Sequence, residues 1–425
     1  MSSASLSAAM DVRFDTARRR AEAAVARARP AVEARAERHT VRVLDAFRDV
    51  GLAATDFQAS TGYGYDAPGR AKLESAWAVL TGAEAALVRP HIASGTAAVA
   101  HMLFAAVRPG VELLIATGDP YDTVRQVITG APGSLAEWGV AHRVLPFAQG
   151  TDPGLLAAAL DPRTAAVLVQ RSRGYARRPA LAVEAVGRLA AAVHGARPDV
   201  AVLVDNCYGE FVEEAEPPAV GADLCAGSWN KNPGGGLAST GGYVAGRAVL
   251  VERAAAHLNG PGQADEVGAV PEGHRLAFQG LFFAPDAVAQ ALLGGVYASA
   301  LFDALGFATD PAPGGEDRID IVTRVEIGAR SALLAAARAI QAHSPVDSRA
   351  LPEGAPMPGY EDPVVMAAGT FVQGSGLELT ADAPMRPPWD LFIQGGLRLA
   401  ATKIAVDAAE RAALSQLGGA PERGA

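Results

Sequence analysis

The stretch "TAAVLVQRSRGYARRPALAVEAVGRLAAAVHGARPDVAVLVDNC" (residues 164–207) decides the fold of this 425-residue chain. It holds two apolar runs, residues 164–172 and 199–207, with a helical pattern at 180–195 between them. Two apolar strands joined by an amphipathic helix are typical of a parallel pair whose connecting helix covers one face. We therefore predict an α/β layer fold built around a mostly parallel sheet.

The same alternation continues on both sides of this stretch. A helix is expected at 70–82, with Gly82 as its stop, and a further strand at 111–118. Residues 11–50 predict one or two amphipathic helices that Pro30 breaks near the middle. Beyond residue 300 the alternation loosens. We predict three parts, namely an N-terminal helical arm at 1–60, a large domain at 61–305 and a small C-terminal α/β domain at 306–425.

Composition excludes several classes of protein. The net charge of −9 argues against a nucleic-acid binder, whose footprint is a basic surface. No uninterrupted apolar run approaches the roughly 20 residues of a membrane span, so no membrane partner is expected. The two cysteines, Cys207 and Cys225, fit neither a disulfide framework nor a zinc pattern, and the histidines show no paired metal spacing. We expect a cytoplasmic protein without a metal site.

Lysine is rare in this chain. Of 37 basic residues only Lys72, Lys231 and Lys403 are lysines, and Lys231 lies in "AGSWNKNPGGGLASTGG" (226–242). A lysine can lose its proton and attack a carbonyl, which an arginine cannot. The glycines after Lys231 allow close approach of a ligand to the backbone. Lys72 and Lys403 fall on predicted helices and are interpreted as surface residues.

Other polar residues mark strand ends, where open α/β sheets bind their ligands. The turn Ser94-Gly95-Thr96 precedes a helix, so it is either an anion site or an ordinary serine cap. Asp205 ends an apolar strand, either as a structural acceptor or as a functional carboxylate. Cys207 is interpreted as a small apolar residue rather than a nucleophile.

One cofactor accounts for these features together. Pyridoxal 5′-phosphate requires a lysine for its Schiff base, a carboxylate beside the pyridine nitrogen and donors for its phosphate. Lys231, Asp205 and the turn at 94–96 supply these three groups. The sequence therefore predicts a pyridoxal-phosphate site that acts on a small amino-acid substrate.

Between residues 55 and 410 the chain resembles the methionine gamma-lyase family proteins, also called aluminium-resistance proteins, which are related to cystathionine gamma-synthase and lyase. The matching stretches are "GYGYDAPGRAKLE", "RPHIASGTAA", "TGDPYDT", "VDNCYGEF", "GSWNKNPGGGLA", "FQGLFFAP", "MPGYEDPVVMAAGTF" and "RPPWDLFIQGGL". The resemblance implies the pyridoxal-phosphate-dependent transferase fold of type I. This fold has a large domain with a mostly parallel seven-stranded sheet between helices and a small C-terminal α/β domain.

The resemblance also implies roles for single residues. Lys231 would carry the Schiff base and move the Cα proton, and Asp205 would pair with the pyridine nitrogen. The phosphate would be held by four residues, Ser94, Gly95, Thr96 and Ser228.

Further roles concern the ring, the substrate and a second subunit. Tyr121 would stack on the pyridine ring and assist proton transfer, and Arg386 would bind the substrate carboxylate. Tyr63 or Tyr65 with Arg70 would reach the phosphate bound by a neighbouring subunit. The resemblance thus implies a homodimer or homotetramer with shared active sites.

The expected activity is that of a carbon–sulfur lyase. The substrate amine would displace Lys231 from its Schiff base, Lys231 would remove the Cα proton to give a quinonoid, and γ- or β-elimination would release a thiol, ammonia and a 2-oxo acid. The alternatives are γ-replacement, aminotransfer or a secondary-metabolite reaction with the same cofactor and, more remotely, a non-catalytic metal-resistance protein. Two features depart from the cystathionine enzymes, namely the wider spacing of Tyr65 and Arg70 and Asn230 in place of a hydroxyl residue. The stretch at 259–275 is longer and more acidic than expected for the family.

Overall fold

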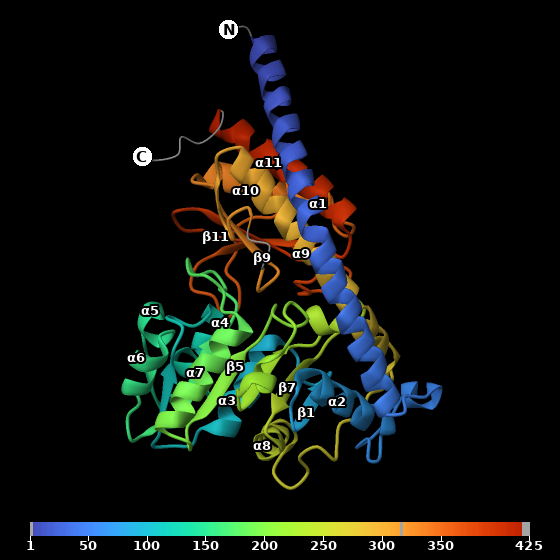
Figure 1. The fold of residues 1–425 in the computed structure, drawn as a ribbon, viewed down its shortest axis with the longest axis vertical. Helices are drawn as coiled ribbons and strands as arrows, with labels where there is room; N and C mark the ends of the chain where they lie inside the picture. The colour runs from blue at the N-terminus through green and yellow to red at the C-terminus, as the bar shows by residue number, and fades with distance from the viewer. Residues whose placement is uncertain (1–2, 315–317, 419–425) are drawn as a thin grey trace. The chain divides into compact units, whose positions relative to one another are not determined.

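The computed structural model describes residues 3–314 and 318–418 (Figure 1). The chain forms two compact units. One is Glu37–Pro285, and the other joins the chain up to Ala36 with the chain from Asp286 onward. Helices α1 (Ser3–Asp49) and α9 (Arg275–Ala304) each run from one unit into the other.

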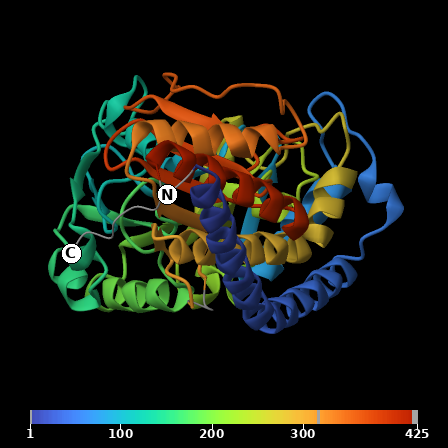
Figure 2. The ribbon, with the colours of Figure 1, turned by 90° about the horizontal axis from the view of Figure 1, so that it is seen from above.

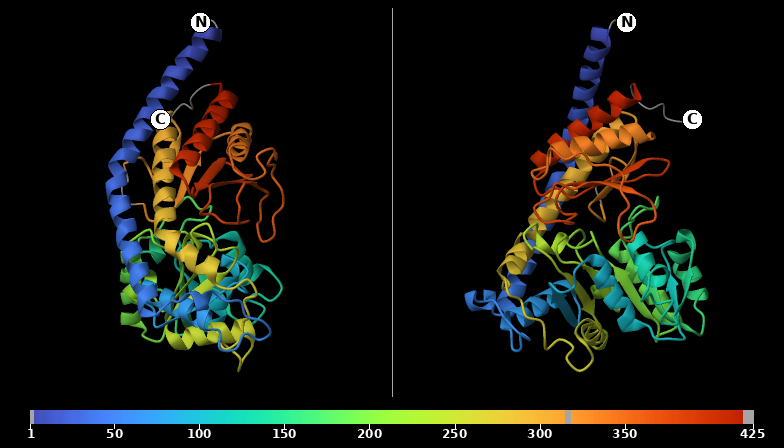
Figure 3. Two further views of the ribbon diagram at one scale, coloured as in Figure 1. Left: turned by 90° about the vertical axis from the view of Figure 1, so that its right-hand side faces the viewer. Right: turned by 180° about the vertical axis from the view of Figure 1, so that it is seen from behind.

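Helix α1 corrects one expectation from the sequence. It is a single helix that continues through Pro30, where a break was predicted (Figure 3). A proline removes one backbone hydrogen bond, but the turns on either side keep theirs. Ala28 and Val32, which flank Pro30, are both buried. Their packing stabilises the helix across the proline, because helical stability in proteins comes mainly from tertiary contacts.

The larger unit contains the predicted seven-stranded sheet, in the order β1-β7-β6-β5-β4-β2-β3. All neighbouring pairs are parallel except those of β7, which runs antiparallel to β1 and β6. The strands are β1 Ala85–Arg89, β2 Glu112–Ile115, β3 Ala141–Val144, β4 Thr164–Gln170, β5 Ala201–Asp205, β6 Leu224–Ser228 and β7 Gly242–Gly246. The mostly parallel sheet predicted from residues 164–207 is confirmed.

Both faces of this sheet are covered, which explains the unbroken apolar runs in its strands. Leu113, Ala166 and Leu203 belong to the core that includes α3 (Gly95–Ala106) and α8 (Ala248–Asn259). The alternate residues Val167 and Val202 are buried as well, and point to the opposite face.

The remaining helices of this unit connect the strands. Helix α2 ends at Gly82, whose φ of 69° is the left-handed conformation expected of a helix stop. The α-helices are α2 Pro68–Thr81, α4 Asp122–Arg125, α5 Phe147–Gly150, α6 Pro153–Ala158 and α7 Val183–Ala196. The short helical turns are η1 Ala54–Phe57, η2 Gln126–Gly130, η3 Pro217–Val220 and η4 Asn232–Gly234.

The second unit is built on a five-stranded antiparallel sheet in the order β10-β11-β12-β9-β8. Helices α10 (Arg330–Ala342) and α11 (Leu399–Leu417) pack side by side, as Figure 2 shows. The strands are β8 Ala308–Asp310, β9 Val322–Glu326, β10 Val364–Ala367, β11 Thr380–Pro384 and β12 Asp390–Gln394.

Helix α9 qualifies the expectation about membranes. By length and composition alone it could cross a bilayer, although 61% of its most apolar window is buried inside the protein. Pro285 and the charged Asp286 interrupt its apolar residues. A buried core helix passes the same test of length and hydropathy, so this helix is weak support for a membrane span.

Candidate active site

The turn at 94–96 and Asp205, both predicted at strand ends, lie near Ser228 at the carboxyl edge of the large sheet. Asp205 is the last residue of β5, and Ser228 is the last residue of β6, the neighbouring strand. Gly95 begins α3 close to both strand ends. A Cβ placed on Gly95 would stand 3.0 Å from Cys207 Sγ and 3.4 Å from Ser228 Cβ. The absence of a side chain at Gly95 therefore lets the N-terminus of α3 approach the two strand ends.

Asp205 carries a buried carboxyl group, 7% exposed. Its Oδ1 accepts the backbone N–H of Cys207 at 3.2 Å. Burial raises the pKa of Asp205, while hydrogen bonds from Cys207 and the positive charges of Lys231 and Arg178 oppose the shift. A cationic group that enters the site would therefore stabilise the ionised form of this carboxyl group.

Lys231 lies three residues beyond Ser228, at the start of η4. Its Nζ lies 4.0 Å from the centre of the Tyr208 ring, a cation–π contact. The two other lysines form ion pairs, Lys72 with Asp56 at 2.8 Å and Lys403 with Glu22 at 2.6 Å. Lys72 and Lys403 were interpreted as surface residues, whereas both side chains are partly buried in these ion pairs.

The hydroxyl residues of the site have defined partners. Ser94 caps α3, because its Oγ accepts the N–H of Ala97 at 3.0 Å. Thr96 Oγ1 lies 2.6 Å from Thr123 Oγ1. Ser228 donates its hydroxyl to the side-chain oxygen of Asn230. Ser94 thus satisfies the N–H of Ala97, while the N–H groups at the very start of α3 have no acceptor inside the helix, and such groups bind anions.

Tyr121 is fixed beside the end of β4. Its backbone N–H donates to Gln170 Oε1 at 2.8 Å, and Gln170 pairs with Asp205 in the sheet. The Tyr121 ring meets Tyr175 edge to face, with centroids 5.2 Å apart. A Cβ on Gly174 would stand 2.7 Å from the Tyr121 ring, so a larger residue there would displace the ring.

Arg70, Tyr63 and Tyr65 lie at a different place in the large unit. The Arg70 side chain is buried and donates to three backbone oxygens, Gly64 O at 2.7 Å, Glu266 O at 3.0 Å and Gly268 O at 3.4 Å. Tyr63 and Tyr65 are exposed and lie 5.5 Å apart between ring centroids. Within the described chain, Arg70 thus links helix α2 to the backbone of the stretch 259–275, and we call this set of hydrogen bonds the Arg70 clamp.

Arg386 belongs to the other unit, just beyond β11. Its Nη1 donates to Asp362 Oδ2 at 2.7 Å, and both side chains are partly exposed. The predicted carboxylate ligand thus has an internal acidic partner, which a substrate carboxylate would have to replace.

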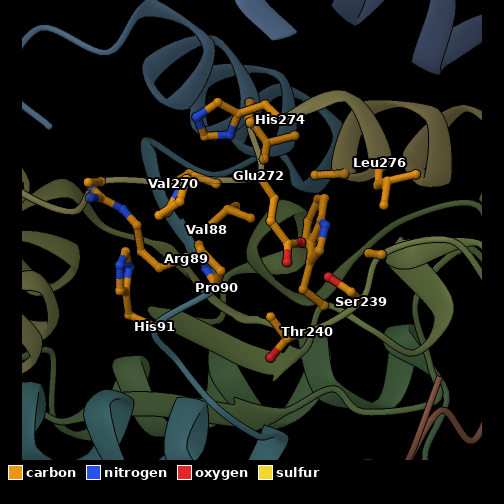
Figure 4. Close-up of a pocket in the computed structure, with 17 residues that line it drawn as sticks. Val88, Arg89, Pro90, His91, Ser239, Thr240, Val270, Glu272, His274 and Leu276 are labelled. Carbon is orange, nitrogen blue, oxygen red and sulfur yellow. The ribbon is translucent and has the colours of Figure 1, made fainter. Parts of the chain in front are cut away.

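A separate cavity of about 520 Å³ lies against the stretch 259–275 (Figure 4). It is lined by Leu73 of α2, by the end of β1 and the two residues after it, by residues 238–240 and by residues 269–274, 276 and 277. Figure 4 shows Glu272 extending toward the side formed by Ser239 and Thr240. Trp229, which lies between Ser228 and Lys231 in sequence, also lines it. The cavity therefore has the loop that carries Lys231 as one of its walls.

Sequence reasoning missed several residues that shape the site. Gln170 and Arg178 hold the end of β4, since Arg178 donates to Gln170 O at 2.9 Å. Thr123, within the matched stretch "TGDPYDT", pairs with Thr96. Tyr208, within "VDNCYGEF", contacts Lys231. The stretches that contain Thr123 and Tyr208 were both recognised from the sequence. Neither periodicity nor spacing distinguished Thr123 and Tyr208 from their neighbours.

The residues present fit pyridoxal phosphate. Asp205 offers a buried carboxyl group that favours a cationic partner, and Lys231 offers an amine whose charge acts on that carboxyl. The space that a side chain at Gly95 would need is occupied by Cys207 and Ser228. The N–H groups at the start of α3 therefore lie close to the ends of β5 and β6. The structure thus offers a nitrogen partner, an amine and an anion-binding turn at one sheet edge.

The fold is that of pyridoxal-phosphate enzymes of fold type I. The pyridoxal-5′-phosphate-dependent protein YhfS of Escherichia coli shares it at a TM-score of 0.59 and 20% identity, over 90% of this chain and 96% of that one. The chain belongs to the methionine gamma-lyase family, whose model matches residues 14–414.

Closer relatives extend over nearly the whole chain. A structure from Listeria monocytogenes, provisionally described as a cystathionine beta-lyase involved in aluminum resistance, has a TM-score of 0.89 and 43% identity, over 94% of this chain and 99% of that chain. A carbon–sulfur lyase involved in aluminum resistance from Clostridium novyi has a TM-score of 0.88 and 36% identity, over 94% and 96%. The uncharacterized protein YnbB of Bacillus subtilis is 43% identical over 91% of this chain and 93% of its own length.

Proposed function

We propose that the protein is a pyridoxal-phosphate-dependent carbon–sulfur lyase that converts a sulfur-containing amino acid and water into a thiol, ammonia and a 2-oxo acid. Family membership and the description of the Clostridium novyi relative support this class of reaction. The observation that carries the proposal is the buried Asp205 carboxyl group within the electrostatic reach of Lys231 at the sheet edge.

Pyridoxal phosphate, when bound, would supply an electron sink that makes the Cα proton of an amino acid acidic. Asp205 would keep a proton on the pyridine nitrogen, because burial destabilises the ionised carboxylate and a protonated nitrogen beside it would stabilise that form again. Burial also excludes water from this contact, which strengthens it.

Lys231 would hold the coenzyme and then move the Cα proton as a general base. The glycines after it keep the loop close to the rest of the unit. A Cβ on Gly234 would stand 2.4 Å from Trp229 O, and one on Gly235 would stand 2.2 Å from Gly280 O. This close packing would hold the Lys231 backbone in place while its amine moves.

The phosphate would lie at the start of α3, where Ser94, Gly95, Thr96 and Ser228 are proposed to bind it. The N–H groups of the first turn and the positive end of this 12-residue helix favour an anion. Tyr121 is proposed to stack on the pyridine ring and to assist proton transfer.

Two roles depend on parts outside this site. We propose that Arg386 exchanges Asp362 for the substrate carboxylate, and that Tyr63 or Tyr65 with Arg70 serves a neighbouring subunit in a homodimer or homotetramer. We also propose a cytoplasmic location, since a reducing compartment suits the free thiols Cys207 and Cys225.

The experiment is product analysis with cystathionine, methionine, homocysteine and cysteine. Elimination at Cβ of cystathionine yields pyruvate and homocysteine, whereas elimination at Cγ yields 2-oxobutanoate and cysteine. The proposal expects a 2-oxo acid, ammonia and a thiol in equal amounts from at least one of the four. With a second 2-oxo acid added as amino acceptor, a new 2-oxo acid that keeps its sulfur and forms without ammonia indicates aminotransfer. With a thiol added as nucleophile, an exchanged side chain without 2-oxo acid indicates γ-replacement.

A non-catalytic metal-resistance protein is the remote alternative. Among the described residues no group of three or more His, Cys, Asp or Glu side chains is arranged to hold a metal ion. Purified protein that binds aluminium but no pyridoxal phosphate would favour that alternative over the lyase.

A further inference from the structure

Two buried glutamates, Glu210 and Glu216, lie in a polar cluster connected to the candidate active site. Glu210 is 0% exposed and Glu216 is 3% exposed. Two carboxyl groups this deeply buried and mutually repelling cannot both ionise at low cost. Their hydrogen bonds decide which one keeps a proton.

Glu216 has two donors that stabilise its ionised form. Its Oε1 accepts the backbone N–H of Phe211 at 2.9 Å, and its Oε2 accepts Asn206 Nδ2 at 2.8 Å. Burial raises the pKa of Glu216, while the positive charges of Arg171 and Arg42 and these two donors oppose that shift. Glu216 is therefore the better carboxylate of the two.

Glu210 lacks such support. Its Oε1 accepts the Tyr243 hydroxyl at 2.8 Å, while its Oε2 has no hydrogen-bond partner within the described chain. Burial and the charge of Glu216 raise the pKa of Glu210 to about 8. A proton on this carboxyl group removes the cost of an unpaired buried charge.

The titratable and charged groups around Glu210 come from several elements and act in both directions. Burial and Glu216 raise its pKa, while its own backbone N–H, the Tyr243 hydroxyl and Arg171 lower it. Both thiols interact with it electrostatically, Cys207 after β5 and Cys225 in β6, and burial keeps both protonated. Since Glu216 is held as the carboxylate, the balance favours a neutral Glu210.

Contacts from Glu210 lead to both functional residues. Its backbone oxygen accepts Asn232 Nδ2 at 3.0 Å, and Asn232 follows Lys231. Tyr243, which donates to its carboxyl group, accepts Asn206 Nδ2 at 3.2 Å, and Asn206 follows Asp205. A Cβ on Gly227 would stand 2.5 Å from Glu210 Oε1, so this carboxyl group lies directly against the strand that ends at Ser228.

We propose that Glu210 is kept as a neutral carboxylic acid and acts as a positioning residue, whose carboxyl group holds the strand end of Asp205 through Tyr243 and Asn206, while its backbone oxygen holds the loop of Lys231 through Asn232. This inference rests on the proposed pyridoxal-phosphate site. Ionisation of Glu210 places a second negative charge beside Glu216. The resulting repulsion displaces Asn206 and Tyr243, so the coenzyme binds less tightly at alkaline pH.

The test compares Glu210→Gln with the wild type over a range of pH. The first measurement is the dissociation constant for pyridoxal phosphate, which is determined from the visible absorption of the bound coenzyme. We expect the wild-type constant to rise about tenfold more than that of Glu210→Gln between about pH 7 and about pH 9, since each pKa unit is worth a factor of ten. Equal pH profiles for the two proteins would overturn the inference.

Two further variants make the result specific. Glu410→Gln is the matched control, because Glu410 is also 0% exposed, also has a pKa near 8 and lies in the other unit. It is expected to keep the wild-type pH profile of coenzyme binding. Glu216→Gln removes the repelling charge, so the alkaline step is expected at lower pH. A step that stays in place in Glu216→Gln contradicts the coupling.

A second measurement separates this inference from the proposed function. Without coenzyme, wild-type stability is expected to fall more steeply than that of Glu210→Gln as the pH rises from about 4.5 to about 8, because the folded state binds a proton there that the unfolded state has lost. If no protein binds pyridoxal phosphate, the proposed function fails while this comparison still decides the state of Glu210. If all the variants bind pyridoxal phosphate, and wild type and Glu210→Gln show the same pH dependence of both binding and stability, only the inference about Glu210 fails.

Discussion

The amine of Lys231 lies 4.0 Å from the centre of the Tyr208 ring. Tyr208 has a φ of 72°, in the left-handed region that few residues other than glycine occupy. This backbone follows the strand that ends at Asp205, so one turn links the buried carboxyl group to the residue that contacts the lysine.

Replacement of Lys231 by alanine is expected to abolish lyase activity, a loss on the order of 10²–10⁴-fold or more, because the general base is removed. Lys231→Arg is the informative companion. A guanidinium can keep the contact with the Tyr208 ring, but it does not lose its proton near neutral pH. Activity is measured as 2-oxo acid release. An arginine variant with near wild-type turnover would contradict the role of Lys231.

Asp205→Asn is expected to lower kcat by roughly 10²–10³-fold, since a neutral amide cannot hold a proton at the pyridine nitrogen through charge. Coenzyme remains attached through Lys231, so the protein stays coloured. Asp199→Asn is the matched control, because Asp199 is exposed and pairs with Arg197 ahead of the same strand. Similar losses in both variants would indicate general destabilisation instead.

Gly227→Ala is expected to destabilise the protein by about 1–3 kcal/mol through overpacking, since the new Cβ would meet Glu210 Oε1 at 2.5 Å and Tyr243 Oη at 2.8 Å. Gly195→Ala is its counterpart, because no atom lies within 4 Å of the added Cβ at the end of α7. That change is expected to be neutral or slightly stabilising. Denaturant unfolding of both variants measures the difference, and equal effects would contradict the packing described.

Glu410 gives a prediction for pH and stability. Both of its carboxyl oxygens lack a hydrogen-bond partner among the described residues, and burial raises its pKa to about 8. The folded state then keeps a proton that the unfolded state loses near its ordinary pKa of 4.5. The contribution to stability is complete below that pH and is lost as the pH rises through about 8. Glu410→Gln is expected to flatten this decline, measured as unfolding free energy against pH. An unchanged slope would mean that Glu410 is ionised in the folded protein.

Arg70→Lys tests the clamp on the stretch 259–275. An ammonium cannot donate in the same planar fork to Gly64, Glu266 and Gly268, so the stretch is expected to open more often. Limited proteolysis is expected to cut it several-fold faster than in the wild type. Arg163→Lys, at an exposed ion pair, provides the control. If proteolysis is unchanged and coenzyme affinity falls instead, Arg70 serves the phosphate rather than the clamp.

The fold was predictable because its signal is local. The apolar runs around Val167 and Val202 and the helix between them follow directly from burial on both faces of a parallel sheet. The break expected at Pro30 was wrong, because the packing of Ala28 and Val32 is tertiary information that a proline rule does not contain.

The site was predictable only in part. Asp205 and Lys231 could be found because one ends an apolar strand and the other is a rare residue type in a glycine-rich loop. Glu210 and Tyr243 could not, since their positions depend on contacts between β6, β7 and the turn after β5. Arg70 was recognised as a motif residue, but two of its three carbonyl partners, Glu266 and Gly268, lie almost 200 positions away in the chain.

The central claim is that Lys231 carries pyridoxal phosphate, and borohydride reduction tests it most directly. Reduction fixes the coenzyme to its lysine, and mass spectrometry of the digested protein then identifies the labelled peptide. The chain has only three lysines, so the assignment is unambiguous. The account predicts a pyridoxyl group on the peptide that contains Lys231 and on neither of the others. A label on Lys72 or Lys403, or no label after saturation with pyridoxal phosphate, would contradict it.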